Sequence, residues 1–576
     1  MKVRLIAAAA VLAGLAATHA PQERDVRSHE GLVVCASGPA CDAGASALAA
    51  GGNAVDAAVA TAFALAVTYP AAGNIGGGGF MIVRTPSGEV TAFDYREKAP
   101  LAATPTMYLD AEGAIDDRLT ASGHLAAGVP GTVRGLEAAH RAFGKRPWRE
   151  LVMPAIRLAE EGFTVSAALA RSLNSALLTM APFPASVAAY GKAGGAEWAA
   201  GDRLVLTDLA RTLRAIADDG PDAFYRGWIA DRVAEDMREN GGLITREDLA
   251  AYEAKVRTPV RGTYRGFDIV SMPPPSSGGV ALIQMLNMLE PLDLQAKGLL
   301  TPAALHLQAE AMRRAFLDRA RHLGDPDFAT SIPVDRLLSK AYAAEAGASI
   351  RADAPSDSAV LGRDLLQAGN AREPDATTHY SIVDRDGMAV ATTTTLEGSF
   401  GSHVVVKGAG FLLNNEMGDF NRRPGYTDTT GPIGTAANVI APGKRMLSSM
   451  TPTIVARDGR VVLVTGSPGG RTIINTVLTI VLGVTEYGLT GREAVALPRM
   501  HHQWMPDRLA IEERMPAAAV SALRGMGHEI RTVARQGDAH SVWIDADGTP
   551  HGVRDERSED SRAATPRELT SPSQRR

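Results

Sequence analysis

Several residue types are scarce in this chain, and each scarcity excludes something. Among its 576 residues only two are cysteine, aromatic side chains make up 5%, and the formal net charge is −5. The two cysteines do not resemble a metal-ligand set, and without a broad basic field no nucleic acid partner is expected. After the first residues no apolar stretch matches the ~20 residues of a membrane-spanning helix, so we expect no stable membrane span. What remains, 45% hydrophobic and 21% charged residues, is typical of a large globular protein.

The N-terminus has the pattern of an export signal. Lys2 and Arg4 precede an uncharged apolar run over Leu5–Ala17, and small residues surround Ala20. We therefore predict a signal peptide over residues 1–20 and a periplasmic or secreted protein. The alternatives are an apolar helix of the fold and an uncleaved, membrane-tethered form.

The two cysteines, Cys35 and Cys41, leave two possibilities open. An oxidising compartment would permit a disulfide between them, which would close only a small loop. Two buried free thiols fit equally well, because connectivity cannot be deduced from spacing.

The pattern of the chain changes near its middle. Helical periodicity dominates the earlier part, as over Val133–Phe143, and the polar segment 355–375 suits an exposed processing loop. Strand patterns follow, and residues 384–387 (Asp-Arg-Asp-Gly) form a strong hairpin turn signal between two of them. Since Thr377 and Thr395 are nearly equidistant from this turn, pairing should place them side by side within about one residue.

Eight short segments follow one another in a fixed order along the chain. They are Gly51–Ala58, Gly73–Phe80, Asp94–Glu97, Pro273–Gly279, Thr377–Ser381, Asn414–Met417, Leu447–Met450 and Gly466–Gly470. Together they resemble the γ-glutamyltransferase (γ-glutamyltranspeptidase) family of self-processing N-terminal-nucleophile hydrolases, over about residues 31–557. The resemblance implies an α+β fold, a four-layer αββα sandwich with two antiparallel sheets face to face.

The resemblance also implies a precursor that cuts itself. A threonine hydroxyl is a poor nucleophile without a base, and cleavage before a threonine turns its new α-amino group, with a pKa near ~8, into that base. The family motif places the cut between Ala376 and Thr377, giving a large subunit (21–376) and a small subunit (377–576) that stay together as a heterodimer. The end of the chain, 558–576, is rich in Ser, Thr, Pro, Arg and Glu, which favours a disordered tail.

Four residues would carry the acyl transfer. Thr377 would attack first the Ala376 carbonyl and later a γ-glutamyl amide, and Thr395 would orient its hydroxyl across the hairpin. Gly469 and Gly470 lie between a predicted strand and helix, where backbone N–H groups carry partial positive charge. The resemblance assigns these N–H groups to the oxyanion hole. Taken alone, the same residues would be an ordinary threonine-rich strand and a tight turn.

A γ-glutamyl group carries both a carboxylate and an ammonium, and other motif residues match the family's recognition of each. Arg96 matches the arginine that clamps the carboxylate, with Ser448 and Ser449 as assisting hydroxyls. Glu416 and Asp419 match the pair that receives the ammonium.

Three positions depart from the family pattern. Glu397 stands where an asparagine is frequent, two residues after the second threonine; its carboxylate could still accept from the ammonium, and it makes the local charge more negative. Glu416 stands where many members have glutamine. In the lid loop, residues 422–437, Thr430 occupies the position of the lid tyrosine, with Tyr426 as the candidate substitute. A less complete lid would admit more water or bulkier substrates.

Two further patterns invite other interpretations. The run Gly76–Gly79 lacks the following helix and distant acid of a dinucleotide site, which favours close backbone packing near the active site. His501 and His502 would point to opposite faces of a strand, and no third ligand is evident, which favours structural packing over a metal site.

We therefore expect a γ-glutamyltransferase and glutathione hydrolase that needs no cofactor, because nucleophile, base and oxyanion donors all come from the chain. It would release cysteinylglycine from glutathione, or another amine from other γ-glutamyl compounds, and pass the acyl group to water, an amino acid or a dipeptide. One alternative is a glutaryl or cephalosporin-type acylase of the same fold, against which Asp419 argues, since an acyl group without an ammonium does not need that carboxylate. The other is a catalytically inactive periplasmic binder of γ-glutamyl compounds, against which Thr377 and Thr395 argue.

Overall fold

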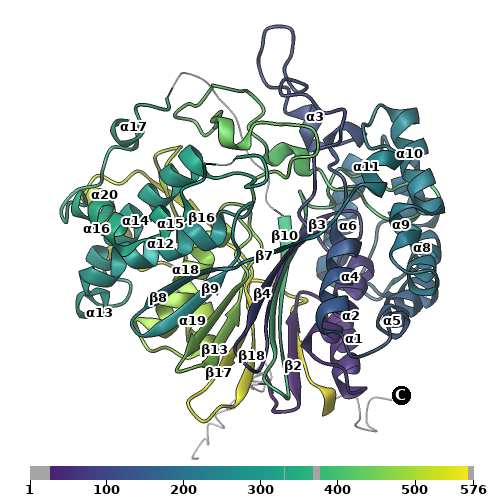
Figure 1. The fold of residues 1–576 in the computed structure, drawn as a ribbon, viewed down its shortest axis with the longest axis horizontal. Coiled ribbons are helices and arrows are strands. Elements are labelled where there is room, and N and C mark those ends of the chain that lie inside the picture. Colours follow the sequence, from purple (N-terminus) through teal and green to yellow (C-terminus); the bar gives the residue numbers. More distant parts are fainter. Residues whose placement is uncertain (1–25, 330, 367–375, 568–576) are drawn as a thin grey trace, which may run out of the picture.

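The structure, a computed structural model, describes residues 26–329, 331–366 and 376–567. Two large sheets stand side by side at the centre, and helices cover the outer face of each (Figure 1). Neighbouring strands in both large sheets run antiparallel in the described ranges. This is the four-layer αββα sandwich of α+β class that the sequence predicted.

The strands of the first sheet lie in the order β1-β18-β17-β13-β12-β9-β8. In that order they span Val26–Arg27, Pro550–Arg554, His540–Ile544, Arg460–Thr465, Thr453–Arg457, Phe267–Ser271 and Val260–Tyr264. The second sheet has the order β19-β2-β10-β11-β3-β4-β7. Its strands span Arg562–Ala564, Gly31–Cys35, Ala376–Asp384, Ala389–Glu397, Gly78–Arg84, Val90–Asp94 and Lys255–Arg257.

Two smaller sheets lie outside the sandwich. One joins β14 (Met500–His501), β15 (Leu509–Glu512) and β16 (Ile530–Val533), and the other joins β5 (Phe163–Thr164) and β6 (Arg203–Leu204).

The helices divide between the two outer layers (Figure 1). The layer against the second sheet contains α1 (Gly38–Ala49), α2 (Ala54–Thr68), α4 (Thr132–Phe143), α5 (Trp148–Glu161), α6 (Ala167–Met180), α7 (Pro184–Tyr190), α8 (Thr207–Asp218), α9 (Asp222–Tyr225) and α10 (Trp228–Asn240). The layer against the first sheet contains α12 (Gly278–Leu289), α13 (Leu294–Lys297), α14 (Pro302–His322), α15 (Val334–Leu338), α16 (Lys340–Ala348), α18 (Thr472–Thr485), α19 (Gly491–Ala496) and α20 (Ala517–Gly525). The short helices α3 (Arg118–Ala121), α11 (Arg246–Ala250) and α17 (Ser358–Leu361) lie in connections.

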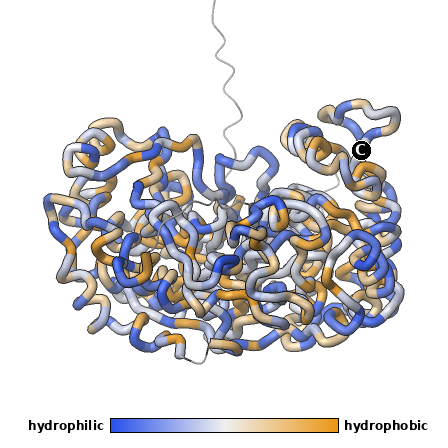
Figure 2. The backbone as a smooth tube through the Cα atoms, turned by 90° about the horizontal axis from the view of Figure 1, so that it is seen from above, coloured by the Kyte–Doolittle hydropathy of each residue, from blue (hydrophilic) through white to orange (hydrophobic). Residues whose placement is uncertain are grey.

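Strand periodicity explains why the second sheet is buried on both faces. In β2, Val33 and Cys35 pack into the core with the helices, whereas Leu32 and Val34 pack into the core between the sheets. Successive side chains of a strand alternate between faces, so an uninterrupted apolar run is what a doubly covered strand requires. Helix α8 instead buries one face only, through residues such as Leu209, Leu213 and Ile216. Along the backbone as a whole, hydrophobic and hydrophilic stretches follow one another (Figure 2).

Helix α2 shows how the sequence sets an element boundary. Asn53 accepts hydrogen bonds from the backbone N–H groups of Val55 and Asp56, and Asp56 accepts one from the N–H of Asn53, which forms a capping box. Helix α1 therefore ends at Ala49, and α2 begins separately at Ala54.

The structure joins Cys35 to Cys41 in a disulfide, which decides between the two possibilities that the sequence left open. None of the described helices has both the length and the apolar character needed to cross a bilayer. The predicted signal peptide, residues 1–20, lies outside the described residues.

The prediction of a disordered tail over residues 558–576 was wrong for the first part of that segment. Strand β19 pairs with β2, with Ala563 opposite Val34, and the side chains of Ala563 and Ala564 are buried. The prediction rested on the polar composition of the segment. Composition gives no signal of a short edge strand that buries only two small apolar side chains. Residues 568–576 lie outside the described residues.

Both large sheets draw strands from either side of the predicted cleavage position. Strands β10 and β11 lie between β2 and β3, and β12 lies beside β9. Two subunits cut between Ala376 and Thr377 would therefore share both sheets and the core between them.

Candidate active site

The hairpin of β10 and β11 sets the position of the predicted nucleophile. Thr377 is paired with Thr395 in the register, which confirms the expectation from the turn. The Thr377 hydroxyl donates a hydrogen bond to Thr395 Oγ1 over 3.4 Å, and the backbone N–H of Glu397 donates to the same oxygen over 2.7 Å. Both threonines are buried, so their hydroxyls are held by protein groups more than by bulk water.

The ladder is interrupted at the predicted cleavage position. The register shifts between Ala376 and Thr377, so that Ala376 lies opposite Glu397 and no residue of β10 is paired with Leu396. Such irregularities leave a residue out of the regular pairing and turn it relative to its neighbours. Glu397 itself has a φ of +76°, a left-handed conformation that is rare for a residue with a long side chain.

The glycines before β3 bring the backbone close to this hairpin. A Cβ atom on Gly77 would lie 2.1 Å from the carbonyl oxygen of Thr395, and one on Gly76 would lie 2.1 Å from that of Leu412. No side chain fits there, so the expectation of close backbone packing is confirmed.

Asn74 is a positioning residue that the sequence did not single out. Its amide donates to the carbonyl of Thr395 over 2.8 Å, and its carbonyl oxygen accepts from the N–H of Gly77 and the hydroxyl of Thr132. It therefore fixes the end of β11. The signal lay inside a quoted motif, Gly73–Phe80, but nothing in the residue type indicated its partners.

Gly469 and Gly470 lie between β13 and α18, as the strand and helix patterns predicted. Their φ values are +126° and +51°, and a Cβ on Gly469 would lie 2.5 Å from Thr472 Oγ1. The N–H groups of Thr472 and Ile473 donate back to the carbonyls of these glycines, which closes a tight turn at the start of α18. The turn thus needs glycine at both positions, and the helix dipole favours negative charge beside it.

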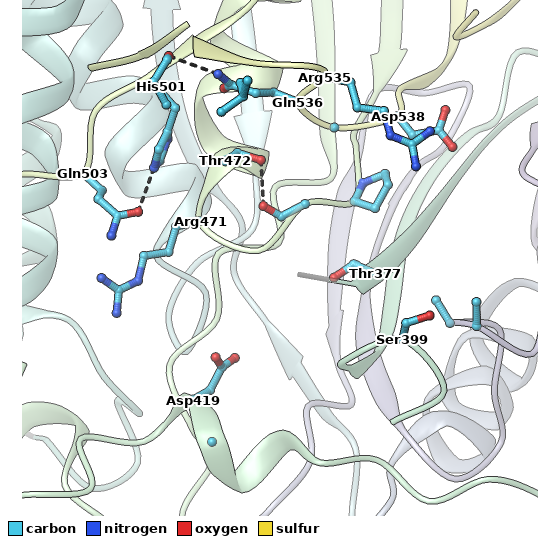
Figure 3. Close-up of a pocket in the computed structure, with 18 of the residues that line it drawn as sticks. Thr377, Ser399, Asp419, Arg471, Thr472, His501, Gln503, Arg535, Gln536 and Asp538 are labelled. Carbon is cyan, nitrogen blue, oxygen red and sulfur yellow. Dashed lines mark hydrogen bonds between the residues drawn. The ribbon is translucent and has the colours of Figure 1, made fainter. Parts of the chain in front are cut away.

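A cavity of about 840 Å³ joins these elements (Figure 3). Thr377, Gly469 and Asp419 all line it, coming from β10, from the turn before α18 and from the segment after β11. It is large enough for a small peptide, since ligand sites commonly measure roughly 300–1,000 Å³.

Arg96 and three carboxylates form a buried group behind Asp419, called here the Arg96 cluster (Arg96, Glu97, Glu416 and Asp419). The guanidinium forms ion pairs with Glu416 and Asp419, lies 3.5 Å from Glu97, and donates to the carbonyls of Met446 and Leu447. The residues predicted to hold a substrate carboxylate and a substrate ammonium are therefore paired with each other here.

Burial and charge act against one another in the Arg96 cluster. Burial disfavours the charge of Arg96, but Glu416 and Asp419 outweigh it and raise the arginine's pKa. Burial raises the pKa of Glu97 to about 7 against the opposing effect of Arg96, and raises that of Glu416 well above its usual value. One buried arginine does not hold the two buried carboxylates and Asp419 all ionised, so we infer that the cluster retains a proton near neutral pH.

Ser448 and Ser449 continue directly from the carbonyls that hold Arg96. Both are buried, and the Ser448 backbone bridges to the segment before α12 through Pro275 and Ser277. Arg319 on α14 donates to Ser449 Oγ over 3.1 Å and to Ser277 Oγ over 2.9 Å. Arg319 also lines the cavity, yet its distance in sequence from both serines gave no signal of this role.

Glu397 and the lid residues Thr430 and Tyr426 are the remaining positions that depart from the family pattern. The Glu397 carboxylate lies near Gly418, beside Asp419. Thr430, at the lid tyrosine's position, lines the cavity, whereas Tyr426 packs under Arg423, with 3.8 Å from the guanidinium carbon to the ring centre, and is not among the lining residues. The structure thus does not place Tyr426 where it could substitute for that tyrosine.

His501 and His502 are both buried and hydrogen-bonded. His501 contacts Asn475 and Gln503, and His502 contacts Asp507 and accepts from the N–H of Trp504. These are contacts of packing histidines, although His501 also lines the cavity.

Comparison with known proteins shows which protein family has this arrangement of residues. The sequence model of the gamma-glutamyltranspeptidase family matches residues 40–565. The glutathione hydrolase proenzyme of Escherichia coli (strain K12) is 44% identical over 98% of this chain and 99% of its own length. The chain belongs to the γ-glutamyltranspeptidase family.

Solved structures agree with this membership. A cephalosporin acylase from Bacillus halodurans superposes with a TM-score of 0.82 at 25% identity, covering 96% of this chain and 99% of that one. A γ-glutamyltranspeptidase chain from Helicobacter pylori superposes with a TM-score of 0.55 at 47% identity, covering 55% of this chain and 91% of that one. The protein is an enzyme of the γ-glutamyltranspeptidase family with the fold of the N-terminal-nucleophile hydrolases.

Proposed function

We propose that this protein is an exported proenzyme that cuts itself before Thr377 and then hydrolyses or transfers the γ-glutamyl group of glutathione and related compounds. The observation that carries the proposal is the Thr377 hydroxyl, which is hydrogen-bonded to Thr395 and lies on the wall of a cavity that Gly469 and Asp419 also line. The relatives named glutathione hydrolase proenzymes support the choice of substrate.

In the precursor, the irregular register at the junction supports self-cleavage. Thr377 Oγ forms an ester to the Ala376 carbonyl carbon as the Ala376–Thr377 C–N bond breaks, and the hydroxyl proton goes to the departing nitrogen, which becomes the α-amino group of Thr377. Water then opens the ester, leaving a carboxylate on Ala376.

In the mature enzyme, the same oxygen attacks the γ-carbonyl carbon of the substrate. The α-amino group of Thr377 takes the hydroxyl proton and passes it to the leaving amine as the amide C–N bond breaks. The N–H groups of Gly469 and Gly470 stabilise the oxyanion. Water or an acceptor amine, such as that of an amino acid or dipeptide, then attacks the ester and regenerates Thr377.

Substrate recognition exchanges partners within the Arg96 cluster. The α-carboxylate of the substrate takes the place of Asp419 on Arg96, with help from Ser448 and Ser449. Asp419 then accepts from the α-ammonium together with Glu416 and Glu397. The exchange conserves ion pairs, so a buried charge is never left without a partner.

Substituting Thr377 by alanine tests the proposal most simply. We expect Thr377→Ala to remain one unbroken chain on a denaturing gel and to lose at least about a thousand-fold in glutathione hydrolysis, since it lacks the nucleophile for both steps. Thr378→Val is the matched control, because the Thr378 hydroxyl has no hydrogen-bond partner among the described residues. It should mature and turn over normally.

Two outcomes would contradict the assignment. Two bands from Thr377→Ala would exclude Thr377 as the processing nucleophile. Wild-type enzyme that cleaves a glutaryl anilide faster than the γ-glutamyl anilide would favour the acylase, in which the ammonium contacts of Asp419 are not needed.

A further inference from the structure

A small sheet at the mouth of the cavity carries arginines that the acyl transfer does not use. His501 pairs with Ala510 and Ala510 with Arg531, so the strands β14, β15 and β16 place these residues in one row. All three line the cavity that contains Thr377. Arg508, two residues before Ala510, falls on the same face by strand alternation and also lines it.

Arg471 adds a third arginine to the lining of the cavity, next to the glycine turn at the start of α18. It follows Gly470 directly, and its side chain points into the cavity from the start of α18 (Figure 3). Arg471, Arg508 and Arg531 are called here the basic rim.

The positive charge of the basic rim comes from its arginines alone. Burial lowers the pKa of His501 to about 3, and the nearby charges of Arg471 and Arg319 act in the same direction, so this histidine is neutral at working pH. Arg508 and Arg531 are exposed, and their side chains form no ion pair or hydrogen bond with any other described residue.

Acidic residues of the same cavity differ in this respect. Asp419 is paired with Arg96, Glu559 with Arg171, and Asp560 accepts from the Ser166 hydroxyl. The fourth acidic lining residue, Asp538, lies 3.6 Å from His540. Arg508 and Arg531 thus leave positive charge available to a ligand.

We propose that the basic rim binds carboxylates on the amine side of the γ-glutamyl bond, so that the enzyme prefers donors and acceptors whose amine part carries one or more free carboxylates. This rests on the proposed function. With the γ-carbonyl between Thr377 and Gly469 and the α-groups at Asp419, the amine part extends toward the remaining wall. Arg471, Arg508 and Arg531 line the cavity, and arginine binds carboxylates through paired N–H donors.

Two chromogenic donors that differ by one carboxylate test this. For γ-glutamyl-4-nitroanilide and its 3-carboxy derivative, the ratio of kcat/KM (carboxylated over neutral) should fall about three- to five-fold in Arg508→Gln and in Arg531→Gln, the effect of an exposed ion pair. Because the carboxylate also alters the leaving aniline, only changes in this ratio between variants are informative. The ratio should also fall in wild type as salt rises above ~0.1 M.

Arg385→Gln is the matched control, since Arg385 is an exposed arginine in the β10–β11 turn and does not line the cavity. It should leave the ratio unchanged, and Arg531→Lys should keep most of the preference. An unchanged ratio in both Arg508→Gln and Arg531→Gln overturns the inference, and leaves the proposed function standing because both donors are still cleaved. Wild-type enzyme that cleaves neither donor overturns both.

Discussion

The arginines in and beside this cavity have opposite surroundings, one buried and paired and the others exposed. Arg96 has 1% of its side chain exposed and is surrounded by carboxylates and carbonyls, whereas Arg508 and Arg531 are exposed and have no side-chain partner among the described residues. A buried charge must keep its partners, because removing one leaves the others desolvated and unpaired. An exposed charge contributes little to folding and is free to select ligands. The comparison separates the Arg96 cluster, which is proposed to bind the γ-glutamyl group, from the basic rim, which is proposed to select the amine part attached to it.

The largest contrast should come from removing the buried arginine. Arg96→Gln leaves Glu97, Glu416 and Asp419 without their cation, so we expect a loss of roughly 3–5 kcal/mol in stability and a strong drop in kcat/KM for γ-glutamyl donors. Arg531→Gln, by contrast, should change stability by less than about 0.5 kcal/mol. Thermal unfolding and steady-state kinetics on both variants give the comparison.

Arg96→Lys is the control for this pair, since it keeps the charge and loses the planar fork. It should recover much of the stability and little of the activity. If Arg96→Gln unfolds together with wild type, the Arg96 cluster does not hold ionised carboxylates in the way described.

An intermediate effect is expected at the hairpin. Thr395→Val keeps the shape of the side chain and removes the oxygen that accepts from Thr377 and from the N–H of Glu397. We expect kcat to fall by up to about 100-fold through misorientation of the nucleophile. The KM should stay near that of wild type, because the contacts with the glutamyl group are elsewhere. A normal kcat would remove Thr395 from the mechanism.

The smallest effect concerns pH. The folded pKa of Glu97 is raised from 4.5 to about 7, so its contribution favours folding below pH 4.5 and is lost as pH rises through 7. We expect Glu97→Gln to flatten the fall of the unfolding temperature between pH 5 and pH 8, by about 3 °C for a chain of this length. Parallel pH profiles for variant and wild type would show that Glu97 is not the group that titrates.

The elements with strong local signals could be predicted from the sequence, and long-range contacts could not. The hairpin turn predicted the pairing of Thr377 with Thr395, and the strand and helix patterns correctly placed Gly469 and Gly470 between β13 and α18. The role of Arg319 escaped prediction because its contact with Ser449 joins residues 130 positions apart. The ion pairs within the Arg96 cluster were missed for another reason: family motifs assign residues to a substrate and do not state what they bind without it.

N-terminal sequencing of the smaller fragment of the purified, active protein tests the central claim most directly. The account predicts two polypeptides, the smaller beginning Thr-Thr-His-Tyr-Ser at Thr377. An active enzyme that consists of one unbroken chain, or a fragment that begins at another residue, would contradict it.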